Sequence, residues 1–206
     1  LGCGISGGVM LVHSEFSRRS FLLAVPGLTA LAAGCGDGQT DAAESGKMLW
    51  QADPAARLYG SQGELPLDTL KDKALLVFFG YVRCPDICPT SLSVVAQVLT
   101  GLSPEERAKM RAVFVTLDPN RDQPEVLSSY VKLFHPDVLA LRSTEPKLKE
   151  IAKAFRVYYV LQKPAEGAAS DVYAVDHTAH TGLVNAKGRL VKLIPYGTQA
   201  EPMRKS

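Results

Sequence analysis

The sequence has little net charge, few cysteines and no long apolar run, and each shortage excludes a class of protein. Its 206 residues include 23 Lys and Arg and 21 Asp and Glu, which gives a formal net charge of +2. A balance this close to neutral creates no broad positive field, so we expect no nucleic-acid partner. We find no internal repeat. Hydrophobic residues make up 46% of the chain, enough for one domain with its own core.

Cysteine is scarce and unevenly placed. The chain has four cysteines, which are Cys3, Cys35, Cys84 and Cys88. Two lie in the N-terminal segment and two lie close together, so they do not form the spaced framework of a disulfide-stapled scaffold. Only Cys84 and Cys88 are therefore expected to share one site in the folded domain.

The N-terminal apolar stretch is too short for an ordinary membrane span. It covers residues 20–33, 14 residues that include Pro26, whereas a transmembrane helix needs about 20 apolar residues. It follows Arg18 and Arg19 and ends at the small-residue boundary before Cys35. This layout is typical of a bacterial export signal. An uncleaved membrane anchor is the alternative.

The same segment predicts a lipid anchor. The paired arginines resemble a twin-arginine signal, and residues 31–35 (LAAGC) resemble a lipoprotein cleavage box that would make Cys35 the lipidated first residue. We therefore expect an export signal in residues 1–34, a flexible tether in residues 35–48 and a folded domain in residues 49–206. The protein is expected to be exported to the periplasmic side of a bacterial membrane and held there by lipid.

Apolar and amphipathic runs alternate through the expected domain. We predict buried strands at residues 74–79, 111–117 and 139–141, and helices at residues 90–102, 124–134 and 145–155. Two further β-like runs, residues 181–185 and 189–194, flank Gly188 and predict a hairpin. Residues 164–170 (PAEGAAS) read as a surface loop. This order predicts an α/β fold with a central mixed sheet covered by helices on both faces.

Cys84 and Cys88 lie between the first predicted strand and the first long helix, in residues 80–89 (GYVRCPDICP). A helix N-terminus favours a thiolate through its free amides and dipole. Their four-residue separation permits a reversible disulfide and also lets both sulfurs bind one soft ion such as Cu(I), or Zn(II). Asp86, within the loop, is expected to tune its charge. A pair of inert buried cysteines is the alternative, although core cysteines seldom occupy a polar, proline-rich loop.

Two sulfurs leave a coordination position open, and four histidines are candidates for it. His13 lies in the signal region, and His135 follows a predicted helix, where we expect an exposed terminal position. His177 and His180 precede the predicted hairpin in a short polar loop that can lie across from the end of the first strand. Spacing does not choose between these two, and a structural role for both is the alternative.

Three stretches make the chain resemble the Sco/SenC family, the copper-binding assembly factors of cytochrome c oxidase. They are residues 78–90 (FFGYVRCPDICPT), residues 115–124 (VTLDPNRDQP), and residues 175–178 (VDHT) followed by the turn at residues 188–190 (GRL). The resemblance covers residues 49–198, and the combination of three motifs makes it specific.

The resemblance implies a thioredoxin-like fold and a copper ion bound by Cys84, Cys88 and His177. It selects His177 over His180 because the family's histidine directly follows the aspartate of the third stretch, here Asp176. It also implies a partner, either the copper-bearing subunit of cytochrome c oxidase or another copper chaperone.

The resemblance leaves some features open. Asp118 and Asp122 match acidic residues of the family's second stretch, although turn and capping roles around Pro119 explain them equally well. Residues 182–185 (GLVN) stand where an aromatic and an acidic residue are usual, so we expect looser packing near the metal-binding histidine. The family's closing helix is expected to be short or missing, because only 11 residues follow Pro195.

Copper chaperoning, which requires no catalytic residue, is the preferred hypothesis. The main alternative is a thiol–disulfide oxidoreductase that uses Cys84 and Cys88 as a redox-active pair to reduce cysteines of an exported oxidase subunit, and that needs an electron donor. A thiol peroxidase fits less well, because no peroxidatic cysteine stands apart from a distant resolving one. A non-catalytic interaction domain is the remaining alternative if the metal site is vestigial.

Overall fold

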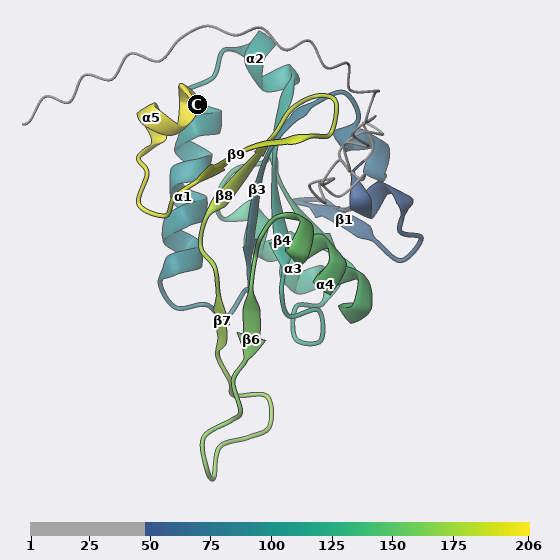
Figure 1. Cartoon of the computed structure of the whole chain (residues 1–206), viewed down its shortest axis with the longest axis vertical. Coiled ribbons are helices and arrows are strands. Elements are labelled where there is room, and N and C mark those ends of the chain that lie inside the picture. Colours follow the sequence, from purple (N-terminus) through teal and green to yellow (C-terminus); the bar gives the residue numbers. More distant parts are fainter. Residues whose placement is uncertain (1–47) are drawn as a thin grey trace, which may run out of the picture. The chain divides into compact units, whose positions relative to one another are not determined.

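A mixed seven-stranded sheet organises the part of the chain that the computed structural model describes, residues 48–206 (Figure 1). Its strand order is β2-β1-β5-β4-β3-β8-β9. The strands are β1 (Arg57–Gly60), β2 (Gly63–Leu65), β3 (Ala74–Gly80), β4 (Met110–Thr116), β5 (Val138–Arg142), β8 (Thr181–Val184) and β9 (Leu190–Ile194). β3, β4 and β5 run parallel, and the other neighbours pair antiparallel. The predicted export signal and Cys35 lie outside the described residues.

Three of the helices lie between the strands close to the predicted places, and shorter elements accompany them. The helices are α1 (Ile87–Thr100), α2 (Pro104–Ala108), α3 (Pro124–Lys132), α4 (Glu145–Ala154) and α5 (Ala200–Arg204), with 3-10 turns η2 (Leu49–Ala52) and η3 (Leu67–Leu70). Within residues 48–206 none of the helices combines the length and apolarity that crossing a membrane requires.

Aromatic contacts show that helices cover both faces of the sheet. Phe78 and Phe79 are neighbours in β3, so their side chains point to opposite faces. On one face Phe78 stacks 6.4 Å from Phe114, which in turn lies 5.3 Å from Tyr130 of α3. On the other face Phe79 lies 5.2 Å from Phe155, the residue after α4. The predicted two-sided α/β arrangement is therefore confirmed.

A two-stranded ribbon extends from the main sheet (Figure 1). It pairs β6 (Tyr159–Leu161) with β7 (Val175–His177), and Tyr159 lies opposite His177. The predicted surface loop, residues 164–170, is exposed and lies between the two strands. The sequence did not predict the ribbon, because strands of three residues are too short to show a period-2 pattern.

The predicted hairpin is formed by β8 and β9, with Gly188 at φ +79° in its turn. This left-handed conformation suits glycine, which lacks a Cβ. The Asn185 side chain supports the turn by accepting hydrogen bonds from the amides of Lys187 and Arg189, each at 3.0 Å. Packing at this hairpin is close, so the expected looseness is wrong. A Cβ on Gly182 would lie 2.9 Å from Phe155 Cδ1, so the glycine makes room for that ring.

The short helix α5 closes the other side of α1. Its Met203 is buried, and Arg204 Nη1 donates a hydrogen bond to the carbonyl of Gly101, just after α1, at 2.7 Å. The family's closing helix was expected to be short or missing, and the structure has a short one.

Candidate metal centre

The end of β3 and the start of α1 position the two cysteines. Cys84 lies in the connecting loop and is half-buried, whereas Cys88 lies in the first turn of α1 and is fully buried. The helix begins at Ile87 rather than at Thr90, because Pro89 is tolerated in a first turn, where its missing N–H has no partner to lose. Cys88 is therefore a helix residue and not a loop residue.

The ribbon strand β7 brings His177 to the cysteines. The ligand atoms of Cys84, Cys88 and His177 all lie within 4.8 Å of one another. Cys88 Sγ lies 3.4 Å from His177 Nε2, and the Cys88 amide donates to Cys84 Sγ at 3.4 Å. The sequence placed His177 in a polar loop, but it is paired in a strand. That pairing sets the backbone from which the imidazole reaches the sulfurs.

The surroundings of His177 prepare its Nε2 atom to bind a metal. Its Nδ1 lies 3.0 Å from the carbonyl oxygen of Thr178, and because a carbonyl only accepts, Nδ1 carries the hydrogen and Nε2 keeps its lone pair. Burial lowers the pKa of His177, so the ring is neutral at pH 7. The rings of Phe78 and Tyr81 meet it edge-on, with centroids 6.3 and 6.2 Å away.

Cys88 differs from the sequence expectation in its protonation. Burial, and then the contact with Cys84, raises the pKa of the Cys88 thiol far above its ordinary value. The helix N-terminus was expected to favour a thiolate, but desolvation of the buried sulfur outweighs it. Cys88 therefore carries a proton in the metal-free protein and must release it to bind a metal ion.

The other described histidines have structural contacts. His180 Nε2 lies 2.8 Å from the carbonyl oxygen of Phe155, which ties the start of the hairpin to the end of α4. His135 was expected to be exposed, but only 11% of its side chain is, and its Nδ1 accepts a hydrogen bond from the Asp137 amide. This hydrogen bond holds the ring against the segment that leads into β5. Cys3, His13 and Cys35 lie outside the described residues.

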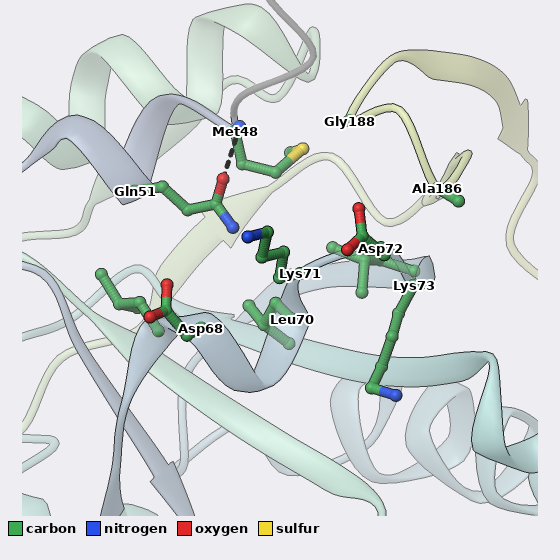
Figure 2. Close-up of a pocket in the computed structure, with 11 residues that line it drawn as sticks. Met48, Gln51, Asp68, Leu70, Lys71, Asp72, Lys73, Ala186 and Gly188 are labelled. Atoms are coloured by element: carbon green, nitrogen blue, oxygen red, sulfur yellow. Dashed lines mark hydrogen bonds between the residues drawn. The ribbon is translucent and has the colours of Figure 1, made fainter.

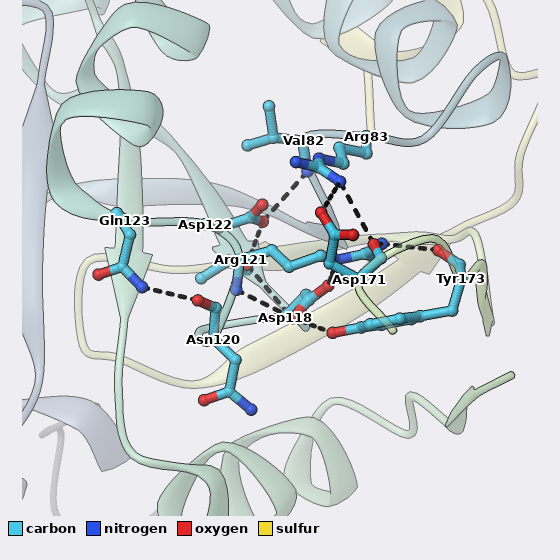
Figure 3. A network of polar contacts seen from close by, with 10 residues as sticks. Val82, Arg83, Asp118, Asn120, Arg121, Asp122, Gln123, Asp171 and Tyr173 are labelled. Carbon is cyan, nitrogen blue, oxygen red and sulfur yellow. Dashed lines mark hydrogen bonds and ion pairs between the residues drawn. The ribbon is translucent and has the colours of Figure 1, made fainter. Parts of the chain in front are cut away.

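The three candidate aspartates have different surroundings. Asp86 is exposed at the N-cap of α1, and its carboxylate accepts a hydrogen bond from Thr90 Oγ1 at 3.4 Å. Asp118 and Asp122 are almost fully buried in a polar network beside the cysteine loop (Figure 3). They belong to one turn, in which the Asp122 amide donates to the Asp118 carbonyl at 2.9 Å.

Sequence reasoning missed Arg121 and Tyr173, which complete this network. The signal was the arginine between the two aspartates of residues 115–124, because an arginine beside buried carboxylates is expected to pair with one of them. Nothing local linked it to Tyr173, which lies more than 50 residues further along the chain.

A separate pocket lies at the other end of β3 (Figure 2). Its lining includes side chains of both signs, among them Asp68, Lys71, Asp72 and Lys73, and neither cysteine nor histidine borders it. Apart from the Met48 thioether, its side-chain donors are carboxylates, amines and an amide, which do not suit a soft metal ion.

The chemistry of the Cys84, Cys88 and His177 group is that of a small, soft metal site. Two sulfurs and one imidazole nitrogen suit Cu(I) or Zn(II). Both cysteines are free thiols in the structure, and their proximity also makes thiol–disulfide chemistry accessible.

Comparisons with known proteins agree with this chemistry. The family model described as SCO1/SenC matches residues 59–206. A SCO2-like protein of Rickettsia prowazekii is 36% identical over 125 residues, which are 61% of this chain and 60% of that protein. The chain thus spans about 60% of the length of this protein and of the SCO2-like proteins of Rickettsia felis and Rickettsia conorii.

Solved structures with bound copper resemble the chain throughout its domain. ScoI of Bradyrhizobium japonicum with copper bound is 31% identical, with a TM-score of 0.61, and the match covers 72% of this chain and 92% of that one. Yeast Sco1 with copper bound is 31% identical, also with a TM-score of 0.61, and the match covers 72% and 82%. The predicted thioredoxin-like fold is confirmed by this likeness.

Proposed function

The chain belongs to the SCO1/SenC family, and we propose that it is a copper chaperone whose ligands are Cys84, Cys88 and His177. The observation that carries this proposal is the convergence of the three ligand atoms within 4.8 Å. The copper-bound Bradyrhizobium and yeast relatives support the choice of metal. Two thiolates and an imidazole suit Cu(I), and one added ligand would suit Cu(II).

The three ligands contribute differently to binding and release. Cys88 is fully buried and lies in a rigid helix turn, so it is the fixed ligand. Cys84 and His177 are half-buried, which leaves them within reach of the ligands of an incoming protein. Copper would leave by exchange at these two residues, and Cys88 would recover its proton from solvent or from the partner.

We propose the copper-bearing subunit of cytochrome c oxidase, or another copper chaperone, as the partner. One family member among the related structures is described as belonging to a family of cytochrome c oxidase assembly proteins. Export and a lipid anchor at Cys35 would keep the copper domain close to a membrane-bound oxidase. Arg18 and Arg19, the apolar stretch of residues 20–33 and the boundary in residues 31–35 support this location.

The anchor has a direct test. Wild-type protein should sediment with membranes, and Cys35→Ala should be released or should accumulate unprocessed. Recovery of wild-type protein without lipid in the soluble periplasmic fraction would rule out the anchor.

A thiol–disulfide oxidoreductase is the second candidate. The contact between the Cys88 amide and Cys84 Sγ favours it, because the contact places Cys84 Sγ beside Cys88. The partial exposure of Cys84 also favours it, because an accessible thiol is needed to form a mixed disulfide. This function needs no histidine, and that difference separates the two candidates.

The experiment is an anaerobic Cu(I) titration of the reduced protein together with a measurement of the Cys84–Cys88 reduction potential. His177→Ala should weaken copper binding at least about tenfold, on the order of 1.4 kcal/mol, and should leave the potential nearly unchanged. His180→Ala is the control, because it has the same side chain but contacts Phe155. Circular dichroism establishes that both variants fold. Unchanged copper affinity in His177→Ala would exclude the three-ligand site and favour the oxidoreductase.

A further inference from the structure

We propose that Arg121 positions His177 for the metal by fastening the segment before β7 to the loop that carries Cys84. This inference rests on the proposed copper site. Arg121 touches neither sulfur nor imidazole in the contacts of the described residues, so it is a positioning residue and not a ligand.

Arg121 lies at the centre of the polar network in Figure 3. Its Nε pairs with the Asp118 carboxylate, and the two side chains are 8% and 0% exposed. Its Nη1 donates hydrogen bonds to the carbonyl oxygens of Tyr173 at 2.7 Å and Asp171 at 2.9 Å. Its Cζ lies 3.5 Å from the centroid of the Tyr173 ring, whose hydroxyl donates to Asp118 Oδ1 at 3.0 Å. One buried guanidinium thus holds the backbone and the side chain of the segment that enters β7.

The same side chain reaches His177 through a second route. The Arg121 guanidinium lies 5.8 Å from the centroid of Tyr81, a distance typical of a cation–π contact. The Tyr81 ring packs against His177, 6.2 Å between centroids and nearly perpendicular. Arg121 therefore contacts both the chain that leads to His177 and a ring that packs against it.

The turn that carries Arg121 is also fixed to the cysteine loop. Asp122 Oδ2 accepts hydrogen bonds from the Val82 amide at 3.1 Å and from Thr116 Oγ1 at 2.5 Å. Because Val82 precedes Cys84 by two residues, the turn holds the sulfur side of the site as well as the histidine side.

The ribbon needs such a fastening. β6 and β7 pair only with each other, over three residues each, and an isolated two-stranded hairpin is marginally stable in water. The position of His177 relative to the cysteines is therefore set by contacts between the ribbon and the body, and the hydrogen bonds of the nearly buried Arg121 side chain to the segment just before β7 are among the polar ones.

Arg83 provides a matched control. Its Nη1 contacts Asp171 as well, at 3.1 Å from Oδ2 and 3.3 Å from the carbonyl oxygen. Both side chains are more than half exposed, 56% and 58%, so solvent screens this pair and little stabilisation is expected.

The test compares Arg121→Lys with Arg83→Lys. Lysine keeps a positive charge beside Asp118, but one ammonium cannot reproduce the planar fork that serves two carbonyls and an aromatic face. Arg121→Lys should weaken Cu(I) binding at least about tenfold, whereas Arg83→Lys should stay within about twofold of wild type. In a His177→Ala background Arg121→Lys should weaken Cu(I) binding no further. If Arg121 acts through His177, its effect on copper affinity disappears once His177 is removed.

A readout in the metal-free protein separates this inference from the proposed function. Hydrogen exchange at the β6 and β7 amides should become faster in Arg121→Lys, while β3 and β4 stay protected. If Arg121→Lys does not fold, Tyr173→Leu takes its place in the experiment. It leaves the buried Arg121–Asp118 ion pair intact and should have the same effects. Unchanged hydrogen exchange and unchanged copper affinity in the folded variants would overturn the inference. So would an Arg121→Lys substitution that weakens copper binding as much in the His177→Ala background as in the wild-type protein. If wild type does not bind copper through His177, the proposed function fails and the exchange result still decides whether Arg121 holds the ribbon.

Discussion

Gly80 ends β3 directly against the buried side chain of Cys88. A Cβ added there would lie 2.6 Å from Cys88 Sγ and 2.9 Å from the ring of Phe114. Carbon and sulfur do not approach this closely without a shift of one of them, so the absence of a side chain at Gly80 sets where the sulfur lies.

Gly80→Ala is therefore predicted to disturb both stability and copper binding. Overpacking a close-packed core costs about 1–3 kcal/mol in the free energy of unfolding, and displacement of Cys88 Sγ should weaken Cu(I) binding. Gly182→Ala is the control, because its Cβ would meet Phe155 at 2.9 Å, away from the cysteines. Urea unfolding should show similar losses in both variants, and copper titration should show a loss in Gly80→Ala alone. Equal copper affinities would mean that the sulfur is not held by this contact.

The protonation of Cys88 predicts a steep pH dependence of copper binding. Its raised pKa keeps the thiol protonated in the metal-free protein at pH 7–8.5, so each copper ion bound must displace that proton and the apparent affinity should rise at least about tenfold per pH unit. The lowered pKa of His177 makes its imidazole neutral over the same range, so it adds no proton.

The measurement is a series of anaerobic Cu(I) competition titrations between pH 7 and 8.5. His177→Ala should bind more weakly but with the same slope against pH. A wild-type slope clearly below tenfold per unit would show that Cys88 is already a thiolate, and a shallower slope in His177→Ala would show that the imidazole loses a proton on binding.

At the scale of elements, strongly patterned segments formed where the sequence predicted them. β3 is a continuous apolar run, β4 has an apolar centre, and α3 and α4 place apolar residues on one stripe. The start of α1 differed by a few residues, which moved Cys88 from the loop into the helix. The ribbon β6–β7 and the strands β1 and β2 were missed, because they have only three or four residues each.

The short helix α5 is predicted to stabilise the domain through one side chain. Met203 is 6% exposed. Truncating a buried methionine lowers the free energy of unfolding by about 2 kcal/mol at the low end of the usual range. We expect this low value here, because a terminal helix can relax around the cavity. Met203→Ala should therefore lower the urea midpoint without changing copper affinity.

Leu133→Ala is the matched control, because Leu133 also lies at a helix end but is 77% exposed. Its effect should stay within about 0.5 kcal/mol. Equal effects of the two substitutions would show that α5 does not pack against α1 in solution.

At the scale of the whole molecule, copper binding should stabilise the fold. The proposed ligands come from two segments that are far apart in the chain, since His177 lies 89 positions after Cys88, so the complete site exists only in the folded state. A ligand that binds only the folded state stabilises it by about 4 kcal/mol at 1,000 times its Kd. Cysteines of the unfolded chain also bind copper and reduce the effect, so we expect a rise in Tm of about 5–10 °C.

Anaerobic thermal unfolding with and without Cu(I) measures this rise, and a Cu(I) chelator should reverse it. His177→Ala should show a smaller rise in Tm at the same copper concentration. The substitution removes a ligand from the folded state only, because in the unfolded chain His177 is not held near the sulfurs. Identical Tm values with and without copper in the wild-type protein would contradict a site formed by folding.

Local patterns were enough to predict the central strands of the sheet, the main helices and the cysteine pair. The apolar run of β3, the helical stripe of α4 and the spacing of Cys84 and Cys88 are signals carried by neighbouring residues, and local propensity and burial act on such neighbours directly. The choice of His177 over His180 came from the family resemblance, which three short motifs of the sequence carry.

Long-range packing settled the rest. It brought His177 beside Cys88 and turned His180 toward Phe155. It buried the Cys88 sulfur deeply enough to raise the thiol pKa against the helix N-terminus, and it joined Arg121 to Tyr173. Desolvation depends on every atom that surrounds a group, and a contact between residues far apart in the sequence depends on the arrangement of the whole sheet. No local sequence pattern therefore predicts the raised pKa or the long-range contacts.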